Sequence, residues 1–286
     1  MNLESAAREL TAPPIERVER PALRYFGGKW MLAPWILEHV TPHVTYVEPF
    51  AGAASVLLRK EASEVEVLND RSGHVVNFFR VLRDDTARLV TALELTPYAS
   101  DEFHACGPLT DDAVENARRF FVRSWMGFGG GTRPTGTGRG FRRCAYRDLG
   151  GQFVAAVENL LAIAARLRSV IIENVDWSVV VEKYDSPETV FYVDPPYLHR
   201  TRGAEGRCDK GYGEFEIGPE THVALIDRLE RIKGAVVISG YPDPLYDLRL
   251  AGWRRVERSV STVQNRERAE VLWTRPATPR TGRRRH

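Results

Sequence analysis

The segment Asp194-Pro195-Pro196-Tyr197 is the part of the sequence best suited to do chemistry. It follows directly on the apolar run 189–193, which is typical of a buried strand. The two prolines fix the backbone and remove its N–H donors, so a carboxylate and an aromatic ring stand on a rigid loop. Such a loop suits a planar amine as ligand. The alternative interpretation is a tight turn after a core strand.

A second pattern, residues 46–56, places a strand before a turn of small residues and then a helix. Small residues let the backbone approach a ligand closely, and the helix points its free N–H groups at it. Only Gly52 is a glycine in the turn 51–54, so the dinucleotide fingerprint is incomplete and hydride chemistry loses support. The next expected strand, 65–68, ends at Asn69-Asp70. An acid about 20 residues past such a turn commonly binds a ribose diol, although Asp70 could instead cap a helix.

These residues resemble the Dam-like adenine-specific DNA methyltransferases, which use S-adenosylmethionine. The resemblance covers about residues 22–275 and includes the order of the motifs. One departure is the cofactor turn, where the more usual glycine-rich form is replaced by Ala51-Gly52-Ala53-Ala54. The matching segments are residues 24–29, 48–55, 69–70, 173–176, 194–197, 236–241 and 268–273.

The resemblance implies an α/β, Rossmann-like methyltransferase fold with a small helical and loop target-recognition insert. It also implies site-specific methyl transfer to N6 of a flipped-out adenine in double-stranded DNA. Three alternatives stay open: a cytosine-N4 methyltransferase, a non-catalytic DNA-binding relative, and a protein or RNA methyltransferase. The acid at Asp194 favours adenine, because serine is more usual for cytosine and asparagine for protein or RNA substrates.

The catalytic residues are expected to be Asp194, Pro195, Pro196 and Tyr197. An adenine amine is a poor nucleophile, since its lone pair is delocalised into the ring. The carboxylate of Asp194 and the carbonyl of Pro195 can accept the amine N–H groups, turn the lone pair toward the methyl group and stabilise the growing positive charge. Tyr197 offers a ring on which a flipped base could stack. This chemistry requires no metal and no covalent intermediate.

The resemblance implies that the cofactor lies along residues 25–29, 48–52, 70 and 176–177. Asp70 would bind the ribose hydroxyls and Asp176 the adenine amine, although Asp176 could simply cap the helix that follows it. Residues 25–26 and Trp177 could be ordinary core aromatics, and Lys29 could bind a cofactor carboxylate, contact DNA or only begin a helix. The expected cofactor residues are Tyr25, Phe26, Gly27, Gly28, Lys29, Glu48, Pro49, Phe50, Ala51, Gly52, Asp70, Asp176 and Trp177.

The segment 118–147 contains eight arginines and no acid, interleaved with aromatic residues. Arginine binds phosphates and reads guanine edges, so double-stranded DNA is the expected partner. An arginine-biased genome is the alternative, since only five of the 40 basic residues are lysine. The expected DNA contacts are Arg123, Arg133, Arg139, Arg142 and Arg143.

Strand and helix patterns alternate along the chain and are interrupted once. The short connection between two late strands, near 253–259 and 270–273, favours an antiparallel hairpin at the end of a mostly parallel sheet. Helices are expected at about 30–40, 73–83, 111–125, 152–167 and 219–232. The expected divisions are a disordered segment 1–20, a catalytic domain 21–96 and 151–275, a target-recognition insert 97–150 and a basic tail 276–286.

Composition sets the remaining expectations. The chain has 286 residues and 43% hydrophobic content, enough for a full core, and it carries no apolar run long enough to cross a bilayer. Three widely spaced cysteines indicate reduced thiols in a cytoplasmic protein, and the seven histidines, scattered along the chain, favour no metal. A cognate restriction endonuclease is a candidate partner. We expect a monomer, since an enzyme that modifies one strand at a time needs no two-fold symmetry.

Overall fold

A computed structural model gives the structure of residues 18–128, 140–201, 215–261 and 267–279. The described residues form a seven-stranded sheet in the order β3-β2-β1-β4-β5-β7-β6. The first five of these strands are parallel, and β7 is antiparallel to both of its neighbours. The α/β fold class and the antiparallel hairpin are thereby confirmed. The strands are β1 Thr45–Glu48, β2 Val65–Asn69, β3 Val170–Glu173, β4 Thr189–Val193, β5 Ala235–Gly240, β6 Arg254–Ser261 and β7 Glu267–Arg275.

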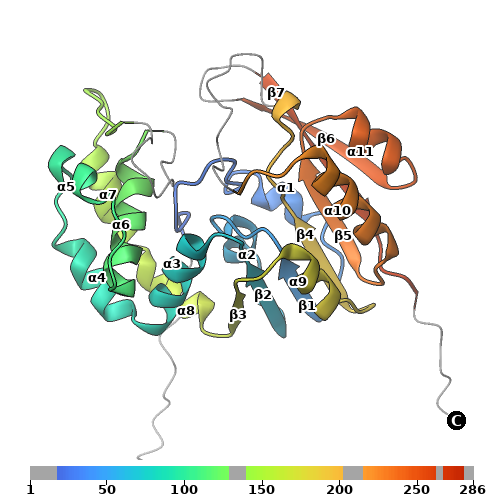
Figure 1. Ribbon diagram of the computed structural model, residues 1–286, viewed down its shortest axis with the longest axis horizontal. Helices are drawn as coiled ribbons and strands as arrows, with labels where there is room; N and C mark the ends of the chain where they lie inside the picture. The colour runs from blue at the N-terminus through green and yellow to red at the C-terminus, as the bar shows by residue number, and fades with distance from the viewer. Residues whose placement is uncertain (1–17, 129–139, 202–214, 262–266, 280–286) are drawn as a thin grey trace, which may run out of the picture.

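Helices cover both faces of the sheet and give it three layers (Figure 1). Successive strand residues point to opposite faces, so Tyr46 and Tyr192 belong to one buried cluster while Val47 and Phe191 belong to the other. This explains why the central strand β4 is apolar after Thr189: both of its faces are buried. One face carries α1 Ala33–Leu37, α2 Ser55–Arg59 and α3 Gly73–Asp84, and the other carries α9 Trp177–Lys183, α10 Pro219–Arg231 and α11 Pro244–Arg249.

A helical lobe extends the first face beyond β3 (Figure 1). Its long helix α6 begins after Asp112, whose carboxylate accepts hydrogen bonds from the N–H groups of Val114 and Glu115. Helix α6 packs on α3 and α4, and α4 also contacts α7 and α8. The expected boundaries at residues 97 and 150 therefore do not coincide with a break in packing. The lobe consists of α4 Thr86–Glu94, α5 Ser100–Ala105, α6 Ala113–Met126, α7 Leu149–Glu158 and α8 Leu160–Leu167.

Two expected helices differ from the observed ones. The helix expected at 30–40 is only Ala33–Leu37, with Pro34 in its first turn, where proline is well tolerated. The helix expected at 152–167 is divided at Asn159 into α7 and α8. The Asn159 side chain accepts a hydrogen bond from the Glu19 N–H and donates one to the Arg20 carbonyl, which fixes the start of the described chain against the lobe.

The expected disordered segment and basic tail lie largely outside the described residues, which begin at 18 and end at 279. In the described part of the chain, no helix has the length and apolarity needed to cross a bilayer. The described histidine, cysteine and acidic side chains form no cluster suited to a metal ion. Cys106 and Cys144 are free thiols.

Candidate active site

The candidate active site lies where the strand order reverses. Strands β1 and β4 are parallel neighbours in the middle of the sheet, while the strands that follow each of them extend in opposite directions. At such a switch point the two loops at the carboxyl ends separate and leave a crevice for a ligand. A cavity of about 260 Å³ occupies this edge, and it is lined by Glu48 at the end of β1 and Asp194 just after β4.

The cavity brings together every residue expected to bind the cofactor, although these residues are spread from Tyr25 to Trp177. Asp194 and Pro196 of the catalytic segment line the same cavity. The structure thus brings the expected cofactor residues and part of the catalytic segment around one cavity. Other lining residues include Asn69, Arg71, Tyr192 and the segment 215–217.

The turn after β1 depends on Gly52. Its φ of +50° lies in the left-handed region, which residues with a side chain rarely adopt. A Cβ atom there would also come within 3.3 Å of the Tyr25 ring. Ala54 has a φ of +52° at the start of α2, where a glycine would be unstrained. The chain thus keeps the turn geometry although position 54 departs from the glycine-rich form.

Asp70 fixes this turn from the neighbouring strand. Its Oδ2 accepts a hydrogen bond from the Gly52 N–H at 2.8 Å, and its Oδ1 accepts one from the Ser72 N–H at 2.8 Å. Ser72, rather than Asp70, is the residue that precedes the first turn of α3. Burial raises the pKa of Asp70 to about 6, and the two backbone N–H groups act in the opposite direction.

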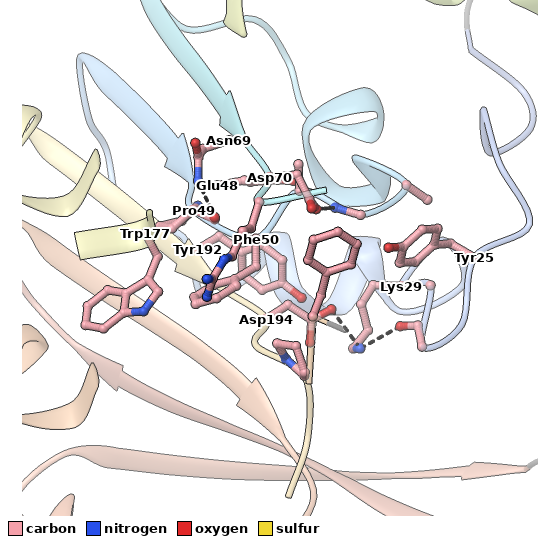
Figure 2. Close-up of a pocket in the computed structure, with 18 of the residues that line it drawn as sticks. Tyr25, Lys29, Glu48, Pro49, Phe50, Asn69, Asp70, Trp177, Tyr192 and Asp194 are labelled. Atoms are coloured by element: carbon pink, nitrogen blue, oxygen red, sulfur yellow. Dashed lines mark hydrogen bonds and ion pairs between the residues drawn. The ribbon is translucent and has the colours of Figure 1, made fainter. Parts of the chain in front are cut away.

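Asp176 and Trp177 each make a structural contact near the cavity. Asp176 caps α9, since its Oδ1 accepts a hydrogen bond from the Ser178 N–H at 3.0 Å. Trp177 stacks against Phe50, with 6.4 Å between ring centroids and an interplanar angle of 27°. Both residues nevertheless line the cavity, and Figure 2 shows Trp177 and Phe50 among its lining side chains.

Lys29 forms an ion pair with Asp194 across the site. Its Nζ lies 2.9 Å from Asp194 Oδ2 and also donates a hydrogen bond to the Gly27 carbonyl at 2.7 Å (Figure 2). The other carboxylate oxygen, Oδ1, accepts a hydrogen bond from the Ser239 hydroxyl at 2.8 Å. The hydroxyls of Tyr192 and Ser239 are 3.0 Å apart, so a chain of polar groups holds Asp194 from the side of the sheet.

Tyr197 does not line the cavity of about 260 Å³ that contains Asp194. Its hydroxyl donates a hydrogen bond to Glu270 on β7, and its ring meets Tyr241 edge to face at a centroid distance of 4.8 Å. Tyr197, Glu270 and Tyr241 line a second cavity of about 380 Å³, which shares the segment 25–29 with the first. Lys29 therefore stands between the two cavities.

Glu48 is fully enclosed at the floor of the site. Its Oε1 accepts hydrogen bonds from the Tyr46 hydroxyl and the Leu57 N–H, both at 2.8 Å. Burial raises the pKa of Glu48 to about 8, against the opposing effect of these two donors. Glu48 thus links β1 to α2 and is a neutral acid over much of the neutral pH range.

The arginines of the insert fall into different environments. Arg123 was expected on a DNA-binding surface, but it is 6% exposed and packs on the Phe103 ring, so that expectation is corrected. Arg142 is half-buried and donates a hydrogen bond to Gln152, whereas Arg143 is exposed beside Phe141. The other two expected contacts, Arg133 and Arg139, lie outside the described residues.

Three polar residues had no expected role and contact the site residues directly. Ser239 and Glu270 hold Asp194 and Tyr197 through the hydrogen bonds already given. Asn69 accepts a hydrogen bond from the Val175 N–H and donates to the carbonyls of Pro49 and Val175, which ties together the loops after β1, β2 and β3. Each is a buried polar residue next to a buried apolar one in its strand, and a polar residue at such a position is the signal that could have found them.

The sheet order and the ligand cavity at its switch point define a Rossmann-like α/β methyltransferase fold. Residues 25–238 match the family of D12 class N6 adenine-specific DNA methyltransferases, and the chain belongs to that family. The protein is therefore an enzyme that methylates N6 of adenine in DNA, as the sequence resemblance implied.

Solved structures of other proteins share low identity with this chain. One is an Escherichia coli protein, yhhF, named only provisionally as a methyltransferase: identity is 12%, the TM-score is 0.35, and the match covers 87% of this chain and 84% of that one. Another is an rRNA methylase from Streptococcus thermophilus, with 8% identity, a TM-score of 0.37, and coverage of 87% and 96%. No curated protein matches the chain.

Proposed function

We propose that the enzyme transfers the methyl group of S-adenosylmethionine to a flipped-out adenine in double-stranded DNA, with Asp194 as the acceptor that activates the amine. One observation carries this proposal. Asp194 stands at the carboxyl end of β4, faces the cavity at the switch point, and has one oxygen held by Lys29 and the other by Ser239.

The cavity fits the proposed cofactor in charge and shape. S-adenosylmethionine carries a positive sulfonium and, when bound, supplies an electrophilic methyl group. The carboxylates of Asp70 and Asp176 line the cavity and favour a cation there. Gly52 and its neighbours Ala51 and Ala53 line the cavity, so the side chains of this turn take up little of the space next to its backbone.

Individual residues have separable tasks in this proposal. Asp70 binds the ribose hydroxyls, because its two oxygens retain lone pairs beyond those used by Gly52 and Ser72. Asp176 accepts a hydrogen bond from the amine of the cofactor adenine, and the stacked rings of Phe50 and Trp177 provide a flat apolar surface for that base.

The target amine is activated by geometry. Each oxygen of Asp194 has a second lone pair, so the carboxylate can accept an amine N–H while Lys29 and Ser239 hold it in place. The Pro195 carbonyl is the proposed second acceptor. With both N–H groups bound, the amine bends toward tetrahedral geometry, so its lone pair is less delocalised into the ring and can point at the methyl group. The negative carboxylate stabilises the charge that develops on nitrogen.

The base has to leave the duplex to reach Asp194, since the amine of a stacked adenine cannot enter a closed cavity. We propose that the Tyr197 ring forms a wall of the cavity that receives it. The insert contacts DNA through Arg142 and Arg143, together with Arg133 and Arg139. A monomer and a cognate restriction endonuclease as partner belong to the same proposal.

Substitution of Asp194 tests the catalytic assignment. Asp194→Ala should lower methyl transfer by at least about 100-fold, because the acceptor of the amine N–H and the charge that stabilises the transition state are both removed. Modified bases in plasmid DNA from expressing cells, and single-turnover rates of the purified enzyme, would measure this. Cofactor affinity should stay near that of the parent.

Asp84→Ala is the matched control, since Asp84 is an exposed acid that pairs with its neighbour Arg83. The control should methylate DNA like the parent. An Asp194→Ala enzyme that forms N6-methyladenine at close to the parental rate would remove Asp194 from the mechanism.

A further inference from the structure

Three charged side chains form a compact group between the two cavities. The Nζ atom of Lys29 lies 2.9 Å from Asp194 Oδ2 and 3.7 Å from Glu270 Oε1. The Lys29 and Glu270 side chains are 6% and 4% exposed, so water screens their interaction only weakly. Lys29 thus lies between two acids, one from the catalytic loop and one from β7.

Glu270 also holds a second member of the catalytic segment. The Tyr197 hydroxyl donates its hydrogen bond to Glu270 Oε1, the same oxygen that faces Lys29. The Lys29 ammonium in turn lies 4.8 Å from the centre of the Tyr197 ring, within the range of a cation–π interaction. Glu270 is therefore joined to the loop at Tyr197 directly and at Asp194 through Lys29.

The charges of this group bear on methyl transfer. The proposed task of Asp194 is to stabilise positive charge on the target amine, and its negative charge serves this only if a neighbouring cation does not cancel it. If Asp194 were the only acid beside Lys29, the positive charge of the ammonium would largely cancel the negative charge of the Asp194 carboxylate. With Glu270 on its other side, the three groups carry a net charge of −1 when both acids are ionised. Burial raises the pKa of Glu270, and Lys29 opposes that rise.

The fold alone gives little reason for an acid at this position. Position 270 is a buried site in a strand whose next residues, Val271 and Leu272, are apolar and fully buried. Replacing buried ionic groups by apolar residues is often neutral or stabilising. The contacts of Glu270 lead instead to Lys29 and to Tyr197.

We infer that Glu270 is a positioning residue for methyl transfer: through Lys29 and Tyr197 it keeps Asp194 oriented, and it offsets the positive charge of Lys29 so that the group as a whole stays negative beside the target amine. The inference rests on the role proposed for Asp194. Glu270 itself acts on the reaction only through these two side chains.

The variant Glu270→Gln keeps the shape of the side chain and removes its charge. The single-turnover rate at saturating cofactor and DNA should fall by about 10- to 100-fold, as expected when a reacting group is misplaced or its charge is compensated. The dissociation constant for S-adenosylmethionine and the melting temperature should stay close to the parental values. This separation of rate from binding and stability distinguishes a positioning role from a structural one.

Glu257→Gln is the matched control. Glu257 lies on β6 and is paired in register with Val271 of β7, but it is exposed and pairs with Arg255. Its rate should equal that of the parent. A second variant, Tyr197→Phe, removes the hydroxyl that reaches Glu270 and should also lower the rate, and the double variant should be less impaired than the product of the two single effects.

The outcomes separate the inference from the proposal on which it rests. A Glu270→Gln enzyme with the parental rate, while Asp194→Ala is inactive, overturns the inference alone. Cofactor affinity and melting temperature that fall in step with the rate would make Glu270 structural and also overturn it. If Glu270→Gln does not fold, a parental rate in Tyr197→Phe overturns it. Activity in Asp194→Ala would remove the proposed function first.

Discussion

The carboxyl edge of the sheet and the helical lobe use charged residues in different ways. At the sheet edge the ion pair of Lys29 and Asp194 is largely buried, and its two residues are separated by 165 positions in the sequence. In the lobe, Arg118 and Arg119 are held by Glu115, three or four residues away on the same helix. The first arrangement exists only once the fold has formed, whereas the second is local.

This difference explains why the two regions were not equally predictable. The segment 118–147 contains no acid, yet Glu115 lies just before it and Glu102 lies on α5. These acids bind Arg118, and hydrogen bonding to that guanidinium lowers the pKa of Glu115 to about 2. An acid-free window therefore does not mean unpaired arginines. Part of this basic segment stabilises the lobe itself.

The largest effect expected at the sheet edge is a dependence of folding stability on pH, caused by Glu48. Its pKa is raised from an ordinary value of 4.5 to about 8, so between these values the folded state keeps a proton that the unfolded state has released. Stability conferred by this group is therefore greatest below pH 4.5 and declines as pH rises toward 8. Glu48→Gln should remove that decline, a gain relative to the parent on the order of a few kcal/mol at pH 8 compared with pH 5.

Urea unfolding at pH 5 and pH 8 would measure the difference. Glu257→Gln, an exposed substitution of the same kind, should follow the parental curve. Parallel curves for Glu48→Gln and the parent would mean that burial at the sheet edge does not perturb this acid, and the contrast with the lobe would weaken.

The next largest effect is on cofactor binding and is expected from a substitution of Asp70. Asp70→Ala should weaken S-adenosylmethionine binding by about 1.5 to 3 kcal/mol, or roughly tenfold to a hundredfold, because it removes a charge-assisted hydrogen bond to the ribose. Since the pKa of Asp70 is raised to about 6, parental affinity should also fall as pH drops through 6, and the variant should lack that dependence.

Calorimetry at pH 5.5 and pH 7.5 would test both statements, with Asp84→Ala as the control. Unchanged affinity in Asp70→Ala would refute the ribose assignment and leave the residue with its structural task of holding Gly52.

The sequence predicted the parts of the site that depend on local patterns. The largely apolar run 189–193 before Asp194 predicted a buried strand and the position of its loop, and the strand-turn-helix pattern around Gly52 predicted the turn at the edge of the cavity. The contacts of Asp194 could not be predicted in this way. They require β5 beside β4 and β7 between β5 and β6, an order that no local period specifies. Ser239 and Glu270 reach the site only through that order.

The burial of the arginines could not be predicted from local patterns either, because it depends on which element packs against their helix. Arg123 lies on the last turn of α6, and its packing against Phe103 comes from the way α5 folds over α6. A helical pattern predicts which residues share a face, but not which neighbouring element covers that face.

The smallest effects test the basic surface of the lobe. Arg142→Gln combined with Arg143→Gln should leave the free energy of unfolding within about 0.5 kcal/mol of the parent. It should flatten the dependence of DNA affinity on salt, by up to about 0.9 in the logarithmic slope for each phosphate group that the variant no longer neutralises. Arg143 should account for the larger share, since it is exposed, whereas Arg142 is half-buried against Gln152.

Two single variants sharpen this test. Arg168→Gln replaces an exposed arginine after α8 and should leave the slope unchanged. Arg118→Gln should leave the slope unchanged but lower stability by about 1 to 2 kcal/mol, because it breaks the half-buried pairs with Glu102 and Glu115. If the Arg142 and Arg143 variant kept the parental slope, these arginines would be surface residues enriched by composition alone. If Arg118→Gln changed the slope, α6 would belong to the DNA surface, and the division between structural and DNA-binding arginines would move from residue 142 back to residue 118.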